Sequence, residues 1–327
     1  MRRRFNDMKL GVFTVLFGSK PLEEMLDYVV DLGIEAVEIG TGAYPGDAYC
    51  KPEELLASEK KLKALRQAIS RRGLVVSALS CHGNPIHPQK KRADADHAAF
   101  MSTLQLAKKL DVETMITFSG CPGGDAKAEQ PNWIVSPWPP EFSKMLDWQW
   151  RERVTPYWKQ AAKTAKAAGV KVAIEMHPNF VAYNPESMLR LRDIAPKTIG
   201  CNFDPSHMIW QQVDVTSAIR ALAGSIFHVH AKDCRVDRAN TMVNGVLDGK
   251  SYTREIERSW IFRTVGYGSD ALFWKDMISN LRMSGYDHVL SIEHEDSLMS
   301  GDEGLKKAVA FLRPLLIAEP AGAAYWA

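Results

Sequence analysis

The sequence contains few cysteines and no pattern that would indicate a disulfide framework. It has five in 327 residues, an odd number without a CxxC pair. They stand at positions 50, 81, 121, 201 and 234. A chain of this length buries a large core and does not need disulfide bonds for stability. We therefore expect a reducing, cytoplasmic location.

Long apolar runs and an excess of one charge are also missing. No segment approaches the roughly 18 uninterrupted apolar residues of a membrane helix, and Arg2-Arg3-Arg4 is not followed by the apolar run of a signal peptide. The net charge is +2 and no basic run exceeds that tripeptide. We therefore expect neither a membrane nor a nucleic acid as a partner. Residues 1–7 are expected to be a disordered leader, and residues 8–327 a single domain.

What the sequence does contain is a regular alternation of short apolar runs with amphipathic, charged stretches of helical length. Apolar runs of this kind are typical of buried parallel strands. They occur at residues 10–14, 36–39, 75–80, 114–118, 172–176, 198–203, 226–230 and 289–293. Helices are expected between them, for example at 22–32, 59–71, 157–168 and 185–194. Eight consecutive βα units predict an α/β fold, a closed (β/α)₈ TIM barrel.

Three connections are too long for ordinary βα loops. They span residues 40–58, 119–147 and 231–269, and each follows a strand, so all three lie at the carboxyl ends of the barrel strands. This is the catalytic face of TIM barrels, where long structureless insertions often form lids or substrate loops. Surface decoration or an oligomer contact is the alternative for each loop.

An acid or an imidazole stands at the end of each of the last four strands. These residues are Glu175, Asp204, His230 and Glu293. A carboxylate in so apolar a strand is costly to bury unless it is paired or bound to a metal. The pattern therefore favours one divalent metal ion, while ordinary ion pairing at the barrel mouth is the competing interpretation. Three carboxylates and one imidazole suit Mn²⁺, our first choice, or Co²⁺, Mg²⁺ and Zn²⁺.

From residue 8 to residue 316 the chain resembles the xylose-isomerase-like barrels, which include sugar isomerases, ketose 3-epimerases, inosose dehydratases and endonuclease IV. The most specific segments of the resemblance are Ile174-Glu175, Asp204–His207, His228-Val229-His230 and Ser291-Ile292-Glu293. In the ketose 3-epimerases, residues at these places hold one metal ion and the two glutamates exchange protons with the substrate. The resemblance thus implies that Glu175 and Glu293 are both metal ligands and catalytic groups, with Asp204 and His230 as ligands only.

This resemblance implies a metal-dependent sugar isomerase or epimerase that abstracts a proton next to a sugar carbonyl and forms an enediolate. Isomerisation, epimerisation and β-elimination share that first step, so the ligand pattern does not separate them. Endonuclease IV, an AP endonuclease, uses additional histidines for three zinc ions. Here the fourth strand ends without a histidine, which argues against that activity. A non-catalytic sugar-binding subunit is a further alternative, and the complete ligand set argues against it.

Several other residues are candidates for the site. His177 lies two residues beyond Glu175, where it could act as a base or support a ligand. By analogy with the Asp-x-x-His motif of the family, His207 is expected to bind substrate or metal-linked water. Lys232 and Arg235 follow the metal histidine and are candidates for holding sugar hydroxyls or an enolate oxygen, with solvent-facing roles as the alternative.

His82 and Glu38 end the third and second strands, and both are expected to contact the sugar. Aromatic residues of the long loops predict a larger substrate, because aromatic faces stack on sugars and on planar aglycones. Trp138 and Trp260 are the leading candidates, and packing of the loops onto the barrel is the alternative role for these tryptophans. The loop at 119–140 and the segment 259–263 resemble the catalytic subunits of C-glycoside deglycosidases, which cleave 3-keto-glycosides with a small partner subunit. That resemblance gives a lyase as the alternative function, and we expect a homo-oligomer in either case.

Overall fold

The computed structural model describes residues 8–18, 20–320, 322–324 and 326. The leader expected at residues 1–7 lies outside this range. Among the described residues, no helix combines the length and the apolar character needed to cross a membrane.

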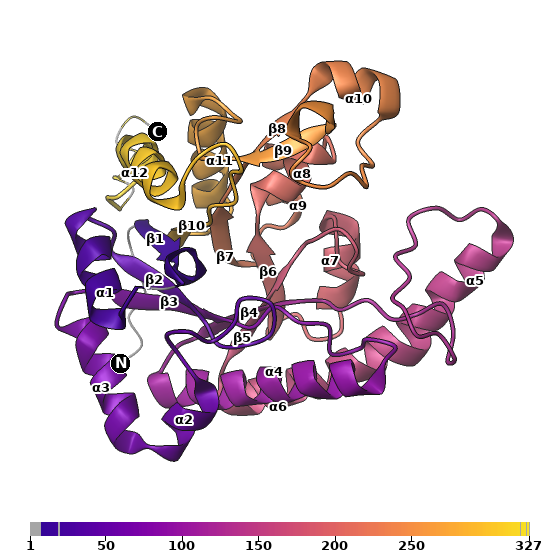
Figure 1. Cartoon of the computed structure of the whole chain (residues 1–327), viewed down its shortest axis with the longest axis horizontal. Coiled ribbons are helices and arrows are strands. Elements are labelled where there is room, and N and C mark those ends of the chain that lie inside the picture. The colour runs from indigo at the N-terminus through magenta and orange to yellow at the C-terminus, as the bar shows by residue number, and fades with distance from the viewer. Residues whose placement is uncertain (1–7, 19, 321, 325, 327) are drawn as a thin grey trace.

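Eight parallel strands close into a barrel in the order β1-β10-β7-β6-β5-β4-β3-β2 (Figure 1). They are β1 (Lys9–Phe13), β2 (Ala36–Gly40), β3 (Val75–Ser80), β4 (Thr114–Phe118), β5 (Lys171–Glu175), β6 (Ile199–Phe203), β7 (Ile226–Ala231) and β10 (Val289–Ile292). Every expected strand is present with its ends within one residue of the prediction. The TIM-barrel fold expected from the sequence is therefore confirmed.

Helices follow the strands and surround the barrel, with α4 and α6 side by side along one flank in Figure 1. The helices are α1 (Leu22–Asp31), α2 (Pro52–Ala57), α3 (Glu59–Ser70), α4 (Lys90–Leu110), α5 (Pro140–Trp148), α6 (Thr155–Ala168), α7 (Pro185–Arg192), α8 (Pro205–Trp210), α9 (Val215–Ala221), α10 (Arg238–Asn244), α11 (Ala271–Met283) and α12 (Gly301–Leu312). Local sequence sets their ends: Gly169 closes α6 at φ 74°, and Asn184 and Ser187 form a capping box before α7.

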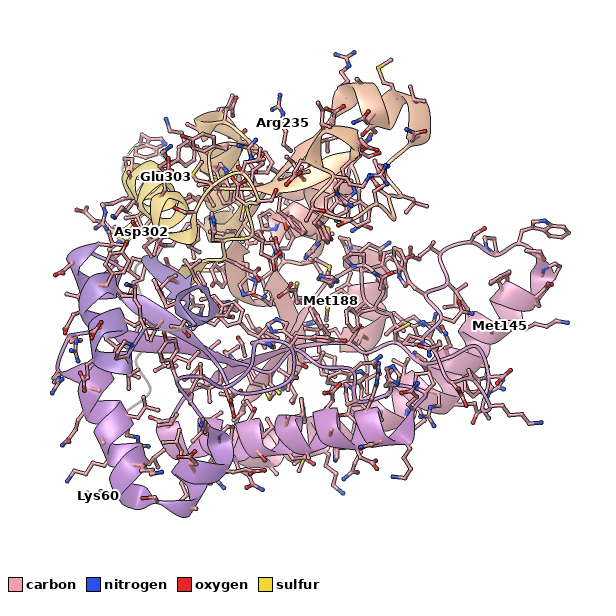
Figure 2. The ribbon with its side chains drawn as sticks, in the orientation of Figure 1. Lys60, Met145, Met188, Arg235, Asp302 and Glu303 are labelled. Carbon is pink, nitrogen blue, oxygen red and sulfur yellow. The ribbon has the colours of Figure 1, made fainter. Side chains whose placement is uncertain are left out.

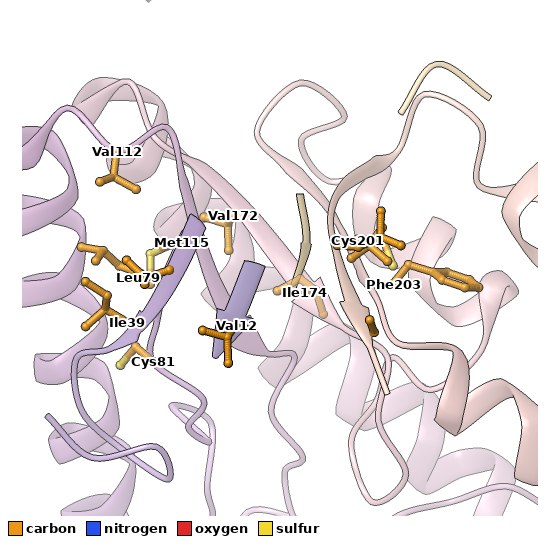
Figure 3. Packing of buried hydrophobic residues seen from close by; sticks show 14 of the residues in the cluster. Val12, Ile39, Leu79, Cys81, Val112, Met115, Val172, Ile174, Cys201 and Phe203 are labelled. Carbon is orange, nitrogen blue, oxygen red and sulfur yellow. The ribbon is translucent and has the colours of Figure 1, made fainter. Parts of the chain in front are cut away.

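The hydrophobic core lies between the strands and the helices. Ile39, Leu79, Met115 and Ile174 are fully buried there, as the close view in Figure 3 illustrates. A second, smaller cluster is formed by Ala78, Ile116 and Ala173, with Phe227 packed against it. Side chains alternate across a strand, so Glu175, two residues beyond Ala173, faces the interior at the carboxyl end of β5.

Register aligns the polar residues of neighbouring strands. Glu175 pairs with Asn202, and Asn202 in turn with His228. On the next pair of strands, Ser291 of β10 lies opposite His230 of β7. The parallel pairing therefore brings residues that are far apart in the sequence into one ring inside the barrel.

The three long connections do contain regular structure, and our expectation of structureless insertions was wrong. The first contains α2 and the second contains α5. The third contains an antiparallel pair, β8 (Asp233–Val236) with β9 (Trp260–Arg263), and helix α10. In Figure 1, α5 extends away from the barrel as an arm, while β8, β9 and α10 form a separate projection beyond β7.

Candidate metal centre

The four residues expected to bind a metal lie together at the carboxyl ends of their strands. Glu175 ends β5, Asp204 follows β6, His230 belongs to β7, and Glu293 follows β10. One ligand atom from each lies within 4.8 Å of the others. Nδ1 of His230 is 3.2 Å from a Glu175 oxygen and 3.0 Å from a Glu293 oxygen. The strand ends therefore place three carboxylates around one imidazole nitrogen.

Three of the four residues in this cluster contribute a buried atom that makes no hydrogen bond. Oδ2 of Asp204, Nδ1 of His230 and Oε2 of Glu293 are buried without a hydrogen bond in the part of the chain that the structure describes. An unsatisfied buried polar atom costs about 1–3 kcal/mol, and more when it is charged. Burial raises the pKa of Asp204, as expected for a carboxylate removed from water. A divalent cation would offset this cost, so the donor set fits a metal ion.

Glu175 is held in place by neutral side chains and by histidines. The amide nitrogen of Asn202 donates to Oε2 at 3.0 Å, and Nε2 of His82 lies 2.9 Å from the same oxygen. Burial would raise the pKa of Glu175, but His230 and His82 outweigh it and hold that pKa well below its usual range. Glu175 is therefore a carboxylate with one anchored oxygen, while Oε1 faces His207 at 3.6 Å.

Glu38 lies below His230, away from the mouth of the barrel. Its oxygens are 3.0 and 3.1 Å from Nε2 of His230, and they also accept hydrogen bonds from the hydroxyls of Ser80 and Ser291. Its exposed fraction is 0%. Our expectation that Glu38 contacts the sugar does not agree with this placement, because its carboxylate is enclosed by protein groups.

Lys232 is a buried cation beside the expected metal ligands. Its Nζ is 3.3 Å from Glu293, 2.6 Å from Glu295, and 4.3 Å from the centre of the Phe262 ring. Burial opposes the charge on Glu293, but Lys232 and His230 outweigh it and hold the pKa of Glu293 at about 2. Glu293 is thus an anion, and with 15% of its side chain exposed it is the most accessible of the four expected ligands.

Two further histidines border Glu175 on the side of β5 and β6. The rings of His177 and His207 are 4.2 Å apart, and both can bring a nitrogen near Glu175. Nδ1 of His177 is 2.7 Å from the carbonyl of Pro178, which leaves Nε2 as the acceptor of a neutral ring. Burial lowers the pKa of His177 to about 3. His177 is therefore a neutral histidine beside the expected metal ligands.

The remaining expected contacts do not come together. Trp260 is 4% exposed, stacks on Trp210 at 4.9 Å, and donates from Nε1 to the carbonyl of Val246. Trp138 is 73% exposed on the arm that leads into α5. Arg235 points outward near the edge of the molecule in Figure 2. In this structure, Trp260 supports the third connection and offers no free face to a substrate.

Sequence reasoning missed two groups that border the site. One is Asn202, which makes hydrogen bonds to both Glu175 and His228. The sequence signal that could have identified it is an asparagine inside an otherwise apolar strand. Aromatic residues form the other group. Phe118, at the end of β4, lies 4.7 Å from the rings of both His82 and His177.

Trp133, in the second long connection, packs against two clusters that contain aromatic residues. One cluster contains Phe118, Cys121 and Phe180, the other contains Trp210, Cys234, Trp260 and Phe262, and Trp133 packs against both. The ring of Phe262 contacts His207 edge-on at 5.6 Å, so the second cluster also reaches the site. Nε1 of Trp133 is buried without a partner among the described residues.

Comparison with known proteins identifies the family of this chain. Residues 26–315 match the family model of the xylose isomerase-like TIM barrels, which confirms the resemblance expected from the sequence. The chain is 38% identical over 312 residues to the uncharacterised protein YfiH of Bacillus subtilis (strain 168), covering 94% of this chain and 98% of that protein.

Solved structures share the fold at lower identity. One is the 3-keto-D-glucoside 4-epimerase of E. coli, with a TM-score of 0.60, 15% identity, and coverage of 94% of this chain and 99% of that one. Another is a xylose isomerase-like TIM barrel protein from Mycobacterium smegmatis in complex with magnesium, with a TM-score of 0.62, 13% identity, and coverage of 94% and 96%.

Proposed function

We propose that this chain, which belongs to the xylose isomerase-like TIM barrel family, is a divalent-metal-dependent sugar isomerase or epimerase. One observation carries the proposal. Ligand atoms of Glu175, Asp204, His230 and Glu293 converge within 4.8 Å, and three of the four residues contribute a buried atom without a hydrogen bond. His207, His230 and Lys232 lie within 4 Å of these carboxylate oxygens without hydrogen-bonding to them, whereas structural ion pairs normally satisfy their members, so this arrangement favours a bound cation.

The four residues would hold the metal ion, which supplies Lewis-acid polarisation of a carbonyl and an adjacent hydroxyl. Glu175 and Glu293 are then the groups that move protons. One carboxylate takes the proton from the carbon next to the carbonyl, and the electron pair of that C–H bond moves toward the carbonyl oxygen to give an enediolate. An epimerase returns a proton to the same carbon from the other face, whereas an isomerase returns it to the neighbouring carbon.

The surroundings of the two glutamates suit this task. Asn202 and His82 fix one oxygen of Glu175, so its other oxygen has a defined position for proton transfer. Lys232 keeps Glu293 anionic. The magnesium complex of the Mycobacterium smegmatis protein and the sugar epimerase of E. coli support the proposal, since the same fold hosts a divalent ion in one and sugar chemistry in the other.

The proposal is tested by incubating the metal-loaded protein with ketohexoses in D₂O and following deuterium incorporation by NMR. We expect exchange at the carbon next to the carbonyl, loss of exchange in EDTA after verified metal removal, and recovery with Mn²⁺ or Co²⁺. Glu293→Gln should slow exchange about 10²- to 10⁴-fold, the usual contribution of general acid–base catalysis. Glu295→Gln, on the same loop but outside the four ligands, is the matched control and should lose far less. Full exchange in EDTA would contradict metal dependence.

A 3-keto-glycoside lyase is the second candidate, and the position of Trp133 favours it. Trp133 packs against the two aromatic clusters that reach His177 and His207. Its Nε1 is a hydrogen-bond donor that no acceptor among the described residues uses. In this reaction a carboxylate removes the C2 proton of a 3-keto-glycoside. The C–H electron pair forms the C1–C2 double bond, conjugated with the C3 carbonyl, while the C1 substituent leaves with its own bonding pair and is then protonated.

Product analysis separates the two candidates. With 4-nitrophenyl 3-keto-glucoside, a lyase releases 4-nitrophenol and an unsaturated keto sugar, and an epimerase gives an isomer that still carries the nitrophenyl group. Release without detectable epimer would favour the lyase, whereas exchange without release would favour the isomerase or epimerase. Addition of candidate small subunits to the same assay tests whether the lyase needs a partner.

A further inference from the structure

We propose that Glu38 is a positioning residue that holds His230 with Nδ1 turned toward the metal ion. The inference rests on the proposed function, because it concerns a ligand of the same metal. It replaces the sugar-binding role expected from the sequence with a role in metal binding.

The two nitrogens of His230 face different surroundings. Nε2 lies 3.0 and 3.1 Å from the two oxygens of Glu38, whereas Nδ1 makes no hydrogen bond and points into the cluster of Glu175 and Glu293. A neutral imidazole has one N–H donor and one acceptor nitrogen. When a carboxylate accepts the hydrogen of Nε2, the lone pair is left on Nδ1, where a metal ion can bind it.

Glu38 is itself held firmly. The hydroxyls of Ser80 and Ser291 donate to its two oxygens at 2.5 and 2.7 Å, from β3 and β10. The ring of Phe13 stacks on His230 with 5.7 Å between ring centres. The two serines therefore fix the carboxylate of Glu38, while Glu38 and Phe13 fix the imidazole of His230. These contacts limit rotation of the His230 side chain.

The same network reaches a second ligand. Nε2 of His228 lies 3.9 Å from Glu38, and its Nδ1 is 3.0 Å from the amide oxygen of Asn202. Asn202 donates its amide hydrogen to Glu175. Glu38, His228 and His230 also lie close enough for their donor atoms to bind an ion of their own. We interpret them as a support, because the oxygens of Glu38 already accept hydrogen bonds and Nδ1 of His230 faces the other cluster.

Glu38→Gln tests the proposal, because the amide keeps the shape of the side chain but loses one acceptor oxygen. Co²⁺ is titrated into metal-free protein while the visible absorption spectrum of the bound ion is recorded. We expect Co²⁺ affinity to fall about 10- to 100-fold, the usual effect of losing a group that supports a metal histidine, and the spectrum to change. At saturating Co²⁺, kcat should fall while KM for the sugar changes little.

Asp233→Asn is the matched control. Asp233 is also fully buried, but its oxygens accept hydrogen bonds from backbone N–H groups, among them those of Gly266, Gly268 and Ser269. This variant should lose stability and keep the Co²⁺ affinity and spectrum. If Glu38→Gln does not fold, the double variant Ser80→Ala with Ser291→Ala removes two donors to Glu38 and should weaken Co²⁺ binding in the same direction, to a smaller extent.

Three outcomes are informative. Wild-type Co²⁺ affinity and spectrum in Glu38→Gln, or in the double serine variant, would overturn the positioning role. A raised KM with unchanged Co²⁺ affinity would also overturn it and return Glu38 to substrate binding. Failure of the wild-type protein to bind Co²⁺ would refute the proposed metal-dependent function itself, which keeps the two failures distinguishable.

Discussion

Replacing Asp204 by asparagine should change stability in opposite directions with and without metal. Oδ1 of Asp204 accepts a hydrogen bond from the backbone N–H of Ser206 at the start of α8, and asparagine can keep this bond. Oδ2 is fully buried without a hydrogen bond, and although Nε2 of His207 lies 3.4 Å away and Nζ of Lys232 3.9 Å away, burial outweighs both and raises the pKa of Asp204. The substitution therefore removes a negative charge that the metal-free fold accommodates poorly, while it removes a ligand from the metal-bound form.

The magnitude follows from these two effects. Relief of an unsatisfied buried acceptor is worth about 1 kcal/mol or more, so in EDTA the free energy of unfolding of Asp204→Asn should exceed that of the wild type by that amount. At a Mn²⁺ concentration 100 times its Kd, the wild type should gain about 2.7 kcal/mol, and the variant should gain almost nothing. Urea unfolding followed by circular dichroism, in EDTA and in Mn²⁺, measures all four values.

Asp233→Asn gives the opposite pattern and serves as the control. It loses an oxygen that accepts several backbone hydrogen bonds, so it should be destabilised by about 1.5–3 kcal/mol under both conditions and still gain stability from Mn²⁺. Our reasoning would be refuted if Asp204→Asn were less stable than the wild type in EDTA. Equal stabilisation of wild type and variant by Mn²⁺ would refute the assignment of Asp204 as a ligand.

The remaining predictions concern the long connections. Trp260→Ala should lower the free energy of unfolding by about 3–5 kcal/mol, as expected for a buried tryptophan, and a loss under 1 kcal/mol would contradict its packing role. Trp133→Phe should raise KM for 4-nitrophenyl 3-keto-glucoside several-fold and leave KM for 3-keto-glucose unchanged; equal effects on both would argue against an aglycone site. Burial opposes the charge on Asp248, but hydrogen bonds from Lys250 and Ser259 hold its pKa at about 2. Because this pKa is depressed, Asp248 should stabilise the fold above about pH 4, with the contribution lost as the pH falls toward 2. Urea unfolding of Asp248→Asn should show a weaker pH dependence in this window, and an identical dependence would contradict the prediction.

The barrel could be predicted closely because parallel strands buried on both faces leave a simple signal. Each appears as a short apolar run, and the eight runs match the eight strands to within one residue. The structure within the long connections was harder to see. Helix α5 begins at Pro140 and α2 begins at Pro52, and proline in the first turn was a usable signal in both cases. Strand β8 gave none, because it starts two residues after β7 without turn residues between them.

The candidate site was predictable in its residue types and not in the orientation of its side chains. Acidic and imidazole groups at the strand ends identified Glu175, Asp204, His230 and Glu293 as one group, and the structure brings them together. Which nitrogen of His230 faces the cluster depends on its contact with Glu38 across the barrel, and no local pattern records that contact. The exposure of the loop tryptophans was not predictable either, because tertiary packing buries Trp260 and leaves Trp138 exposed.

The distribution of hydrogen bonds among the buried polar groups argues that the upper barrel is a binding site and the lower barrel its support. Deeper in the barrel, Glu38, Asn202 and His228 are bonded to one another or to neighbouring side chains. At the strand ends, atoms of Asp204, His207, His230 and Glu293 that make no hydrogen bond gather in one place, whereas those of Arg192, Ser259 and Trp274 belong to separate elements. Stability alone would favour bonding in both layers, because each unpaired buried atom has a cost. A layer of satisfied groups beneath a layer of unsatisfied ones is the arrangement expected when the lower layer orients the upper one toward a cation and a substrate.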